Sequence, residues 1–173
     1  MQLQQHPQRI LLPAKISFIA LTLALALLFD LLPWGNAVGV PALTAAVLAF
    51  WCIHQPRRVG IGIAWTLGLL LDVADGALLG QHALGYSVLA FLALAVHRRI
   101  LWFPSWQQAL HLLLLLLSTQ LLTLVIRIGA GADFPGWSYF AGSFVSAALW
   151  PALSFLLLLP QRQAEMMDEN RPI

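Results

Sequence analysis

The chain has 173 residues, of which 60% are hydrophobic and 9% are charged, and its formal net charge is +2. One soluble core cannot hide so much apolar surface, so the composition excludes an ordinary soluble domain and predicts that lipid covers the molecule. The sequence shows no basic stripe with interleaved aromatic residues, which argues against nucleic acid as a partner.

Six apolar segments follow one another along the chain. They cover residues 16–32, 38–53, 59–71, 84–96, 109–126 and 139–159. A helix needs about 20 residues to cross a hydrocarbon core of roughly 30 Å, so a re-entrant hairpin is an alternative for the second and third segments. The third segment reaches full length only if it continues through Asp72 and Asp75 to about Leu79. We predict an all-α, polytopic membrane bundle of about six transmembrane helices.

Basic residues lie in every second gap between these segments. Arg9 and Lys15 precede the first segment, Arg57 and Arg58 follow the second, Arg98 and Arg99 follow the fourth, and Arg162 and Arg171 follow the sixth. Short loops rich in Lys and Arg stay in the cytoplasm, so both termini are predicted to be cytoplasmic. The predicted organisation is a cytoplasmic segment over 1–15, a transmembrane domain over 16–159 and a cytoplasmic tail over 160–173. The two internal Arg pairs are candidate contacts for anionic lipid or a cytoskeletal filament.

Acidic residues and glycines gather at the end of the third segment. On a helix, Asp72 and Asp75 share a face, and so do Gly76 and Gly80. Carboxylates within a membrane are costly, and small residues let a second helix approach closely. These four are therefore candidate partner-binding or helix-interface residues. In the alternative, Asp72 already reaches the headgroups and the glycines only shape a turn.

Arg127, at the outer end of the fifth segment, departs from the basic pattern. Its similar predicted depth leads to the hypothesis that it pairs with Asp72 and joins the third and fifth helices, with Asp75 and Asp133 as other candidate partners. Alternatively, its side chain extends to a lipid phosphate.

The sequence offers no convincing catalytic or metal-binding arrangement. An intramembrane aspartyl protease needs two acids that face each other, whereas Asp72 and Asp75 would point in parallel from one helix. No two-histidine spacing accompanies these acids, and Cys52 is the single cysteine. We predict no metal, no cofactor and no enzymatic activity.

Several stretches resemble the MreD family of rod shape-determining proteins. They are Pro-Arg-Arg-Val-Gly-Ile-Gly at 56–62, Gly-Leu-Leu-Leu-Asp at 68–72, Asp-Gly-Ala-Leu-Leu-Gly at 75–80, Trp-Gln-Gln-Ala-Leu at 106–110 and Leu-Trp-Pro at 149–151. The resemblance covers residues 32–163. It ends in the tail, where Glu165, Asp168 and Glu169 stand in place of the family's usual basic end.

The resemblance implies a bundle in the bacterial inner membrane, similar to the substrate-binding subunits of energy-coupling-factor transporters. It also implies a non-enzymatic subunit of the cell-wall elongation complex, which binds the single-span scaffold MreC and works with MreB and the peptidoglycan synthases. The transporter-like fold suggests an alternative, a small-molecule-binding carrier subunit with Asp72 and His111 in its pocket. A homodimer is compatible with the sequence.

Overall fold

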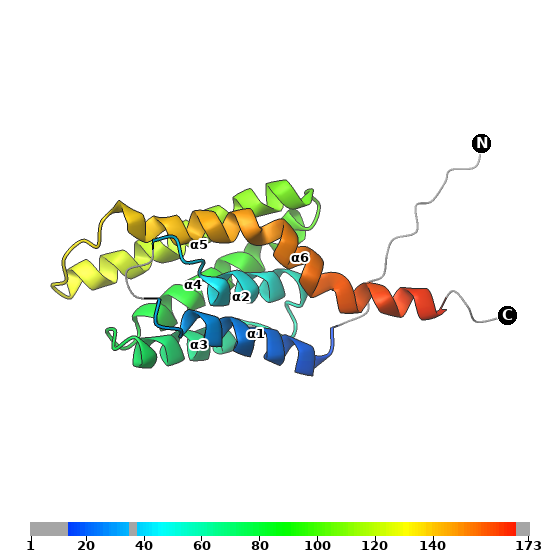
Figure 1. Cartoon of the computed structure of the whole chain (residues 1–173), viewed down its shortest axis with the longest axis horizontal. Helices are drawn as coiled ribbons and strands as arrows, with labels where there is room; N and C mark the ends of the chain where they lie inside the picture. The colour runs from blue at the N-terminus through cyan, green and yellow to red at the C-terminus, as the bar shows by residue number, and fades with distance from the viewer. Residues whose placement is uncertain (1–13, 35–37, 169–173) are drawn as a thin grey trace.

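The computed structural model describes residues 14–34 and 38–168, with side chains described up to Gln161. Its helices are α1 (Ile16–Asp30), α2 (Leu43–His54), α3 (Ile61–Ala74), α4 (Gln81–Ile100), α5 (Ser105–Gly129) and α6 (Ala141–Asp168), with a short 3-10 helix η1 (Trp137–Phe140) ahead of α6. No strand occurs in this part of the chain, so the predicted all-α class is confirmed. Successive α-helices run in opposite directions (Figure 1).

The centre of the bundle is α2. Every side chain from Thr44 to Ile53 is buried, and the helix packs against α1, α4, α5 and α6. A helix that is apolar on all sides is stable where protein or lipid covers it, and here four other helices cover α2. The second apolar segment, for which a re-entrant hairpin was an alternative, is therefore an interior helix of the bundle.

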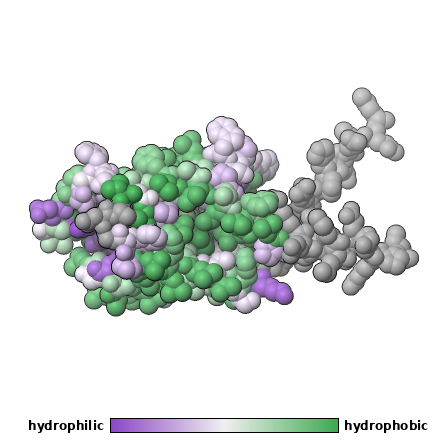
Figure 2. Space-filling view, in the orientation of Figure 1, coloured by the Kyte–Doolittle hydropathy of each residue, from purple (hydrophilic) through white to green (hydrophobic). Residues whose placement is uncertain are grey.

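The other helices also pack on one another. Helix α3 packs on α4, α4 on α5 and α5 on α6, whereas α1 packs mainly on α2. In Figure 1, α5 and α6 lie along one side of the bundle and α1 and α3 along the other. Figure 2 shows apolar side chains along the middle of the visible face and hydrophilic ones mainly toward its two ends. This distribution is typical of a bundle whose flanks contact lipid.

The helices differ in length. Three stretches are long and apolar enough to cross a membrane, namely α4, α5 and Trp137–Gln161. The helices α1, α2 and α3 have 15, 12 and 14 residues. At 1.5 Å per residue they are only about 18–22 Å long, against a hydrocarbon core of roughly 30 Å. Three spans are thus supported by length, and the predicted total of about six stays a prediction.

The third apolar segment forms a short helix. The third apolar segment does not continue as a helix to Leu79, because α3 ends at Ala74 and a turn follows. Helix α4 then begins at Gln81, so the acidic and glycine-rich stretch lies at a helix end and in a turn.

Candidate functional site

Asp72 is a buried carboxylate that caps the neighbouring helix α4. Its Oδ1 accepts a hydrogen bond from the backbone N–H of His82 at 2.8 Å, and its Oδ2 accepts from the N–H groups of Gly80 at 2.9 Å and Ala83 at 3.3 Å. The Nδ1 of His82 lies 2.9 Å from the same Oδ1. The first N–H groups of a helix have no partner within it and lie at the positive end of its dipole, so they stabilise a carboxylate. The side chain of Asp72 therefore faces a helix interface and not solvent.

Gly68 brings α3 and α4 close enough for this capping. A Cβ at Gly68 would lie 2.5 Å from the Cα of Ala83 and 2.5 Å from the carbonyl oxygen of His82. Gly68 precedes Asp72 by one helical turn, so both lie on the face of α3 that contacts α4. Sequence reasoning missed Gly68 as a site residue, although its spacing from Asp72 was a visible signal.

Asp30 makes the same kind of contact one hairpin earlier. It is the last residue of α1, and its two carboxylate oxygens accept hydrogen bonds from the first two N–H groups of α2 at 3.1 and 2.9 Å. Asp30 precedes Asp72 by the same number of residues as Lys15 precedes Arg57. Sequence reasoning did not single out Asp30 as a site residue, although this equal spacing was a visible signal.

Gly76 and Gly80 lie in the turn between α3 and α4. Their φ angles are +61° and +99°, in the region that favours glycine. The N–H of Ala77 bonds to the carbonyl oxygen of Asp72 at 3.0 Å, the Schellman arrangement that closes a helix end. No atom lies within 4 Å of a Cβ built at either glycine. The prediction that these glycines share a helical face is wrong, and the structure supports the turn alternative.

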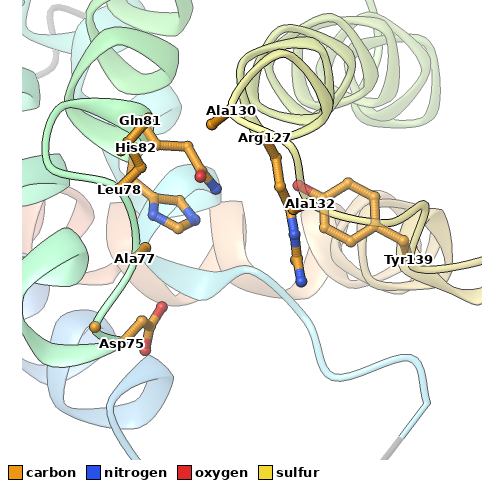
Figure 3. Close-up of a pocket in the computed structure, with 10 residues that line it drawn as sticks. Asp75, Ala77, Leu78, Gln81, His82, Arg127, Ala130, Ala132 and Tyr139 are labelled. Carbon is orange, nitrogen blue, oxygen red and sulfur yellow. The ribbon is translucent and has the colours of Figure 1, made fainter.

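A polar pocket lies at this end of the bundle, between the α3–α4 turn and the end of α5. It has a volume of about 480 Å³, and Asp75, Gln81 and His82 face Arg127 and Tyr139 across it (Figure 3). These side chains carry both charge signs, an amide, an imidazole and a phenol, so they can hydrogen-bond polar groups of either charge. Within the described residues, no group of three His, Cys, Asp or Glu side chains could hold a metal ion.

The hypothesised ion pair between Arg127 and Asp72 is not present in the structure. The carboxylate of Asp72 bonds to backbone N–H groups around the start of α4, and the side chain that it contacts there is the imidazole of His82. For the side chains described between residues 14 and 161, no salt bridge joins Arg127 to an acid. Arg127 and Asp133 are both exposed. The guanidinium of Arg127 therefore faces the pocket, where it can meet an acidic group or a lipid phosphate.

The internal Arg pairs lie at the opposite end of the bundle, which we call the basic end. Arg57 and Arg58 follow α2, Arg98 and Arg99 lie in the last turn of α4, and all four are exposed. We call the other end, which holds Asp30, Asp72, Asp75 and Arg127, the acidic end. The antiparallel course of the helices produces this separation (Figure 1). Which end faces the cytoplasm stays a prediction.

The two residues suggested for a carrier pocket lie far apart. The ring of His111 stacks on Phe103 near the basic end, with ring centroids 5.1 Å apart. Asp72 lies beside His82 at the acidic end. With a rise of about 1.5 Å per residue, the length of α4 separates the two regions by on the order of 20 Å. The structure does not bring Asp72 and His111 into one ligand site.

Comparisons with known proteins point to one family. Residues 8–159 match the family model described as rod shape-determining protein MreD. The rod shape-determining protein MreD of Haemophilus influenzae is 28% identical over 144 residues, which cover 82% of this chain and 89% of that protein. No solved structure matches the chain. Because the family model covers most of the sequence, this chain belongs to the MreD family of rod shape-determining proteins.

Proposed function

We propose that this chain is a non-enzymatic, multi-pass subunit of the bacterial inner membrane that maintains rod shape by binding a single-span scaffold of the MreC type. Through this scaffold it would be linked to MreB and the peptidoglycan synthases. Membership of the MreD family supports the role in rod shape. The observation that carries the partner-binding part is the polar pocket at the acidic end, which Asp75 and Arg127 line from opposite sides.

The position of this pocket favours a protein segment as its ligand. Carrier sites lie near the bilayer midplane between helices, whereas this pocket is built on two turns at the end of the bundle. Asp75 and Arg127 are both exposed there. The segment that flanks a partner's single transmembrane helix lies at this depth, where it leaves the bilayer. Its polar side chains could bond to both Asp75 and Arg127.

The outer flank of α5 leads to the same pocket. Leu114, Leu121 and Val125 are exposed and lie on one side of this helix, which ends next to Arg127. Helices in lipid associate through close packing and hydrogen bonds, because apolar burial gains nothing over contact with lipid tails. A partner helix along this flank would gain packing contacts on α5 and hydrogen bonds at the pocket.

We also propose that the basic end faces the cytoplasm. Arg57, Arg58, Arg98 and Arg99 would hold the chain at the anionic inner leaflet or contact an acidic surface of MreB. The exposure of all four side chains supports such contacts.

Site-specific photo-crosslinking in membranes tests the proposal. A photoreactive residue at Val125 or Ala132 is expected to become attached to a single-span scaffold. The control position is Leu25, which is equally exposed but lies on α1, on the other side of the bundle. Equal attachment from Leu25, or a tightly retained small molecule in a sample that carries no partner, would contradict the assembly role.

A further inference from the structure

We infer that the groove between α1 and α3 binds one anionic phospholipid, with its phosphate on Arg57 and Arg58 and one acyl chain between the two helices. The groove has a volume of about 560 Å³. It runs from Ile16 to Leu27 on α1 and from Ile63 to Leu70 on α3. This volume lies within the range of roughly 300–1,000 Å³ that is usual for small-molecule sites.

The groove exists because its two walls are held by different neighbours. Helix α1 packs on α2 and buries Ile19, Leu23 and Ala26, whereas α3 packs on α4, where Gly68 makes the close approach. The two helices lie on the same side of the bundle (Figure 1). Because α1 is held by α2 and α3 is held by α4, an open groove remains between α1 and α3.

The chemistry of the lining matches a lipid. Apart from the two arginines at one end, every residue that lines the groove is apolar. Arg58 donates one hydrogen bond to the carbonyl oxygen of Ala14, which leaves other N–H groups of its guanidinium available. Arg57 is exposed beside it. Guanidinium groups bind phosphate through paired hydrogen bonds, and the apolar furrow suits a hydrocarbon chain.

The length of the groove selects an acyl chain over a second transmembrane helix. From Ile16 to Leu27 the helical rise amounts to about 16 Å, which is close to half of a hydrocarbon core of roughly 30 Å. One acyl chain occupies one leaflet, whereas a transmembrane helix crosses both. The furrow therefore fits a lipid that starts at the arginine pair and ends near the bilayer midplane.

The groove is separate from the partner contact proposed at the acidic end. The groove lies between α1 and α3 and begins at the basic end, whereas the proposed scaffold contact lies on α5 and at the opposite end. Crosslinking from Val125 reports on the scaffold contact, and lipid retention reports on the groove.

The test measures which lipid the purified full-length chain retains from micelles with equal amounts of phosphatidylglycerol and phosphatidylcholine, by native mass spectrometry. We expect the wild type to retain phosphatidylglycerol selectively. Arg57→Gln keeps the bond between Arg58 and Ala14 and should weaken retention about fivefold, and the double change Arg57→Gln and Arg58→Gln about 30-fold. The matched comparison, Arg98→Gln with Arg99→Gln, removes the same charge at the same end but does not touch the groove, so it should weaken retention much less than the loss of Arg57 and Arg58.

A groove-filling variant separates the groove from charge alone. Ala24 lines the groove and is exposed, so Ala24→Phe occupies the furrow without changing the core or the arginines. It should lower phosphatidylglycerol retention about as much as loss of the Arg pair, with an unchanged melting temperature of the lipid-free protein. Retention that is equal in all variants, or equal losses in both double Arg variants, would overturn the inference. A photoreactive residue at Ala24 that captures a protein instead of lipid would also overturn it.

Discussion

At the scale of single residues, the acid that looked most functional has a structural contact that explains its burial. A carboxylate inside a membrane is costly unless hydrogen bonds replace its water. The hydrogen bonds that Asp72 accepts from three backbone N–H groups, together with its contact with the ring of His82, offset this cost. The burial of Asp72 therefore follows from its capping of α4.

Asp72→Asn is expected to destabilise the protein. The amide replaces one acceptor oxygen with an NH2 group that faces backbone N–H donors, and each buried donor left unpaired costs about 1–3 kcal/mol. Thermal unfolding of the purified protein in detergent measures the loss. The control is Asp133→Asn in an exposed loop, which should change stability by no more than about 0.5 kcal/mol. Equal stability of the two variants would show that the capping contact contributes little.

Arg127→Gln is expected to weaken binding of the single-span scaffold while leaving the fold intact, because the side chain is exposed at the pocket. Loss of a hydrogen bond to a charged group costs about 1.5–3 kcal/mol, which corresponds to about tenfold or more in affinity. Co-purification at matched protein levels measures this. Arg98→Gln changes the same charge at the basic end and should retain the scaffold. If both variants retain it equally, Arg127 is not part of the interface.

At the scale of helices, close approach and capping act together. Both short hairpins use a carboxylate at or near the end of one helix to cap the next, so the chain can turn without leaving N–H groups unpaired. In the second hairpin this needs the glycine at position 68, because the backbones are in contact there. The glycines of the turn permit its positive φ angles and do not pack against another helix.

Gly68→Ala is expected to push α3 away from α4. The added methyl group would lie 2.5 Å from backbone atoms that cannot rotate aside, so the helices must shift. Overpacking of this kind costs about 1–3 kcal/mol. Gly62→Ala on the same helix is the control, because nothing lies within 4 Å of its added Cβ. That variant should be neutral or more stable by up to about 1 kcal/mol, since alanine favours a helix. Thermal unfolding of both variants decides whether the contact at Gly68 matters.

At the scale of the whole molecule, charge divides the bundle into two ends. Both internal Arg pairs and Lys15 lie at the basic end, and the capping aspartates lie at the acidic end. The apolar flanks between them are exposed over α1, α3 and α5. A molecule of this kind offers polar contacts at its ends and packing contacts along its sides.

Labelling of introduced cysteines is expected to show the orientation of these ends. Asp133→Cys should react with an impermeant maleimide in intact spheroplasts, and Arg99→Cys only in inverted vesicles, because arginine-rich loops stay in the cytoplasm. The natural Cys52 is buried and should contribute little background. The opposite pattern would reverse the proposed orientation and place the pocket on the cytoplasmic side.

The sequence by itself determined the class of the protein, the approximate helices and the division into two ends. These properties follow from local composition, because apolar segments and the arginines between them require only lipid and water as partners. The family was also recognisable from the stretches around Arg57, Asp72 and Trp150.

Only the tertiary structure decided which neighbour each residue contacts. In the structure, α2 lies in the interior of the bundle. Asp72 bonds to backbone N–H groups of α4 and not to Arg127, and the close contact between helices is at Gly68 and not at Gly76. Periodicity shows which residues share a helical face, but the acceptor that satisfies a free helix end can come from any segment that packing brings near. For that reason the candidate residues were found in the sequence, while their partners were found only in the fold.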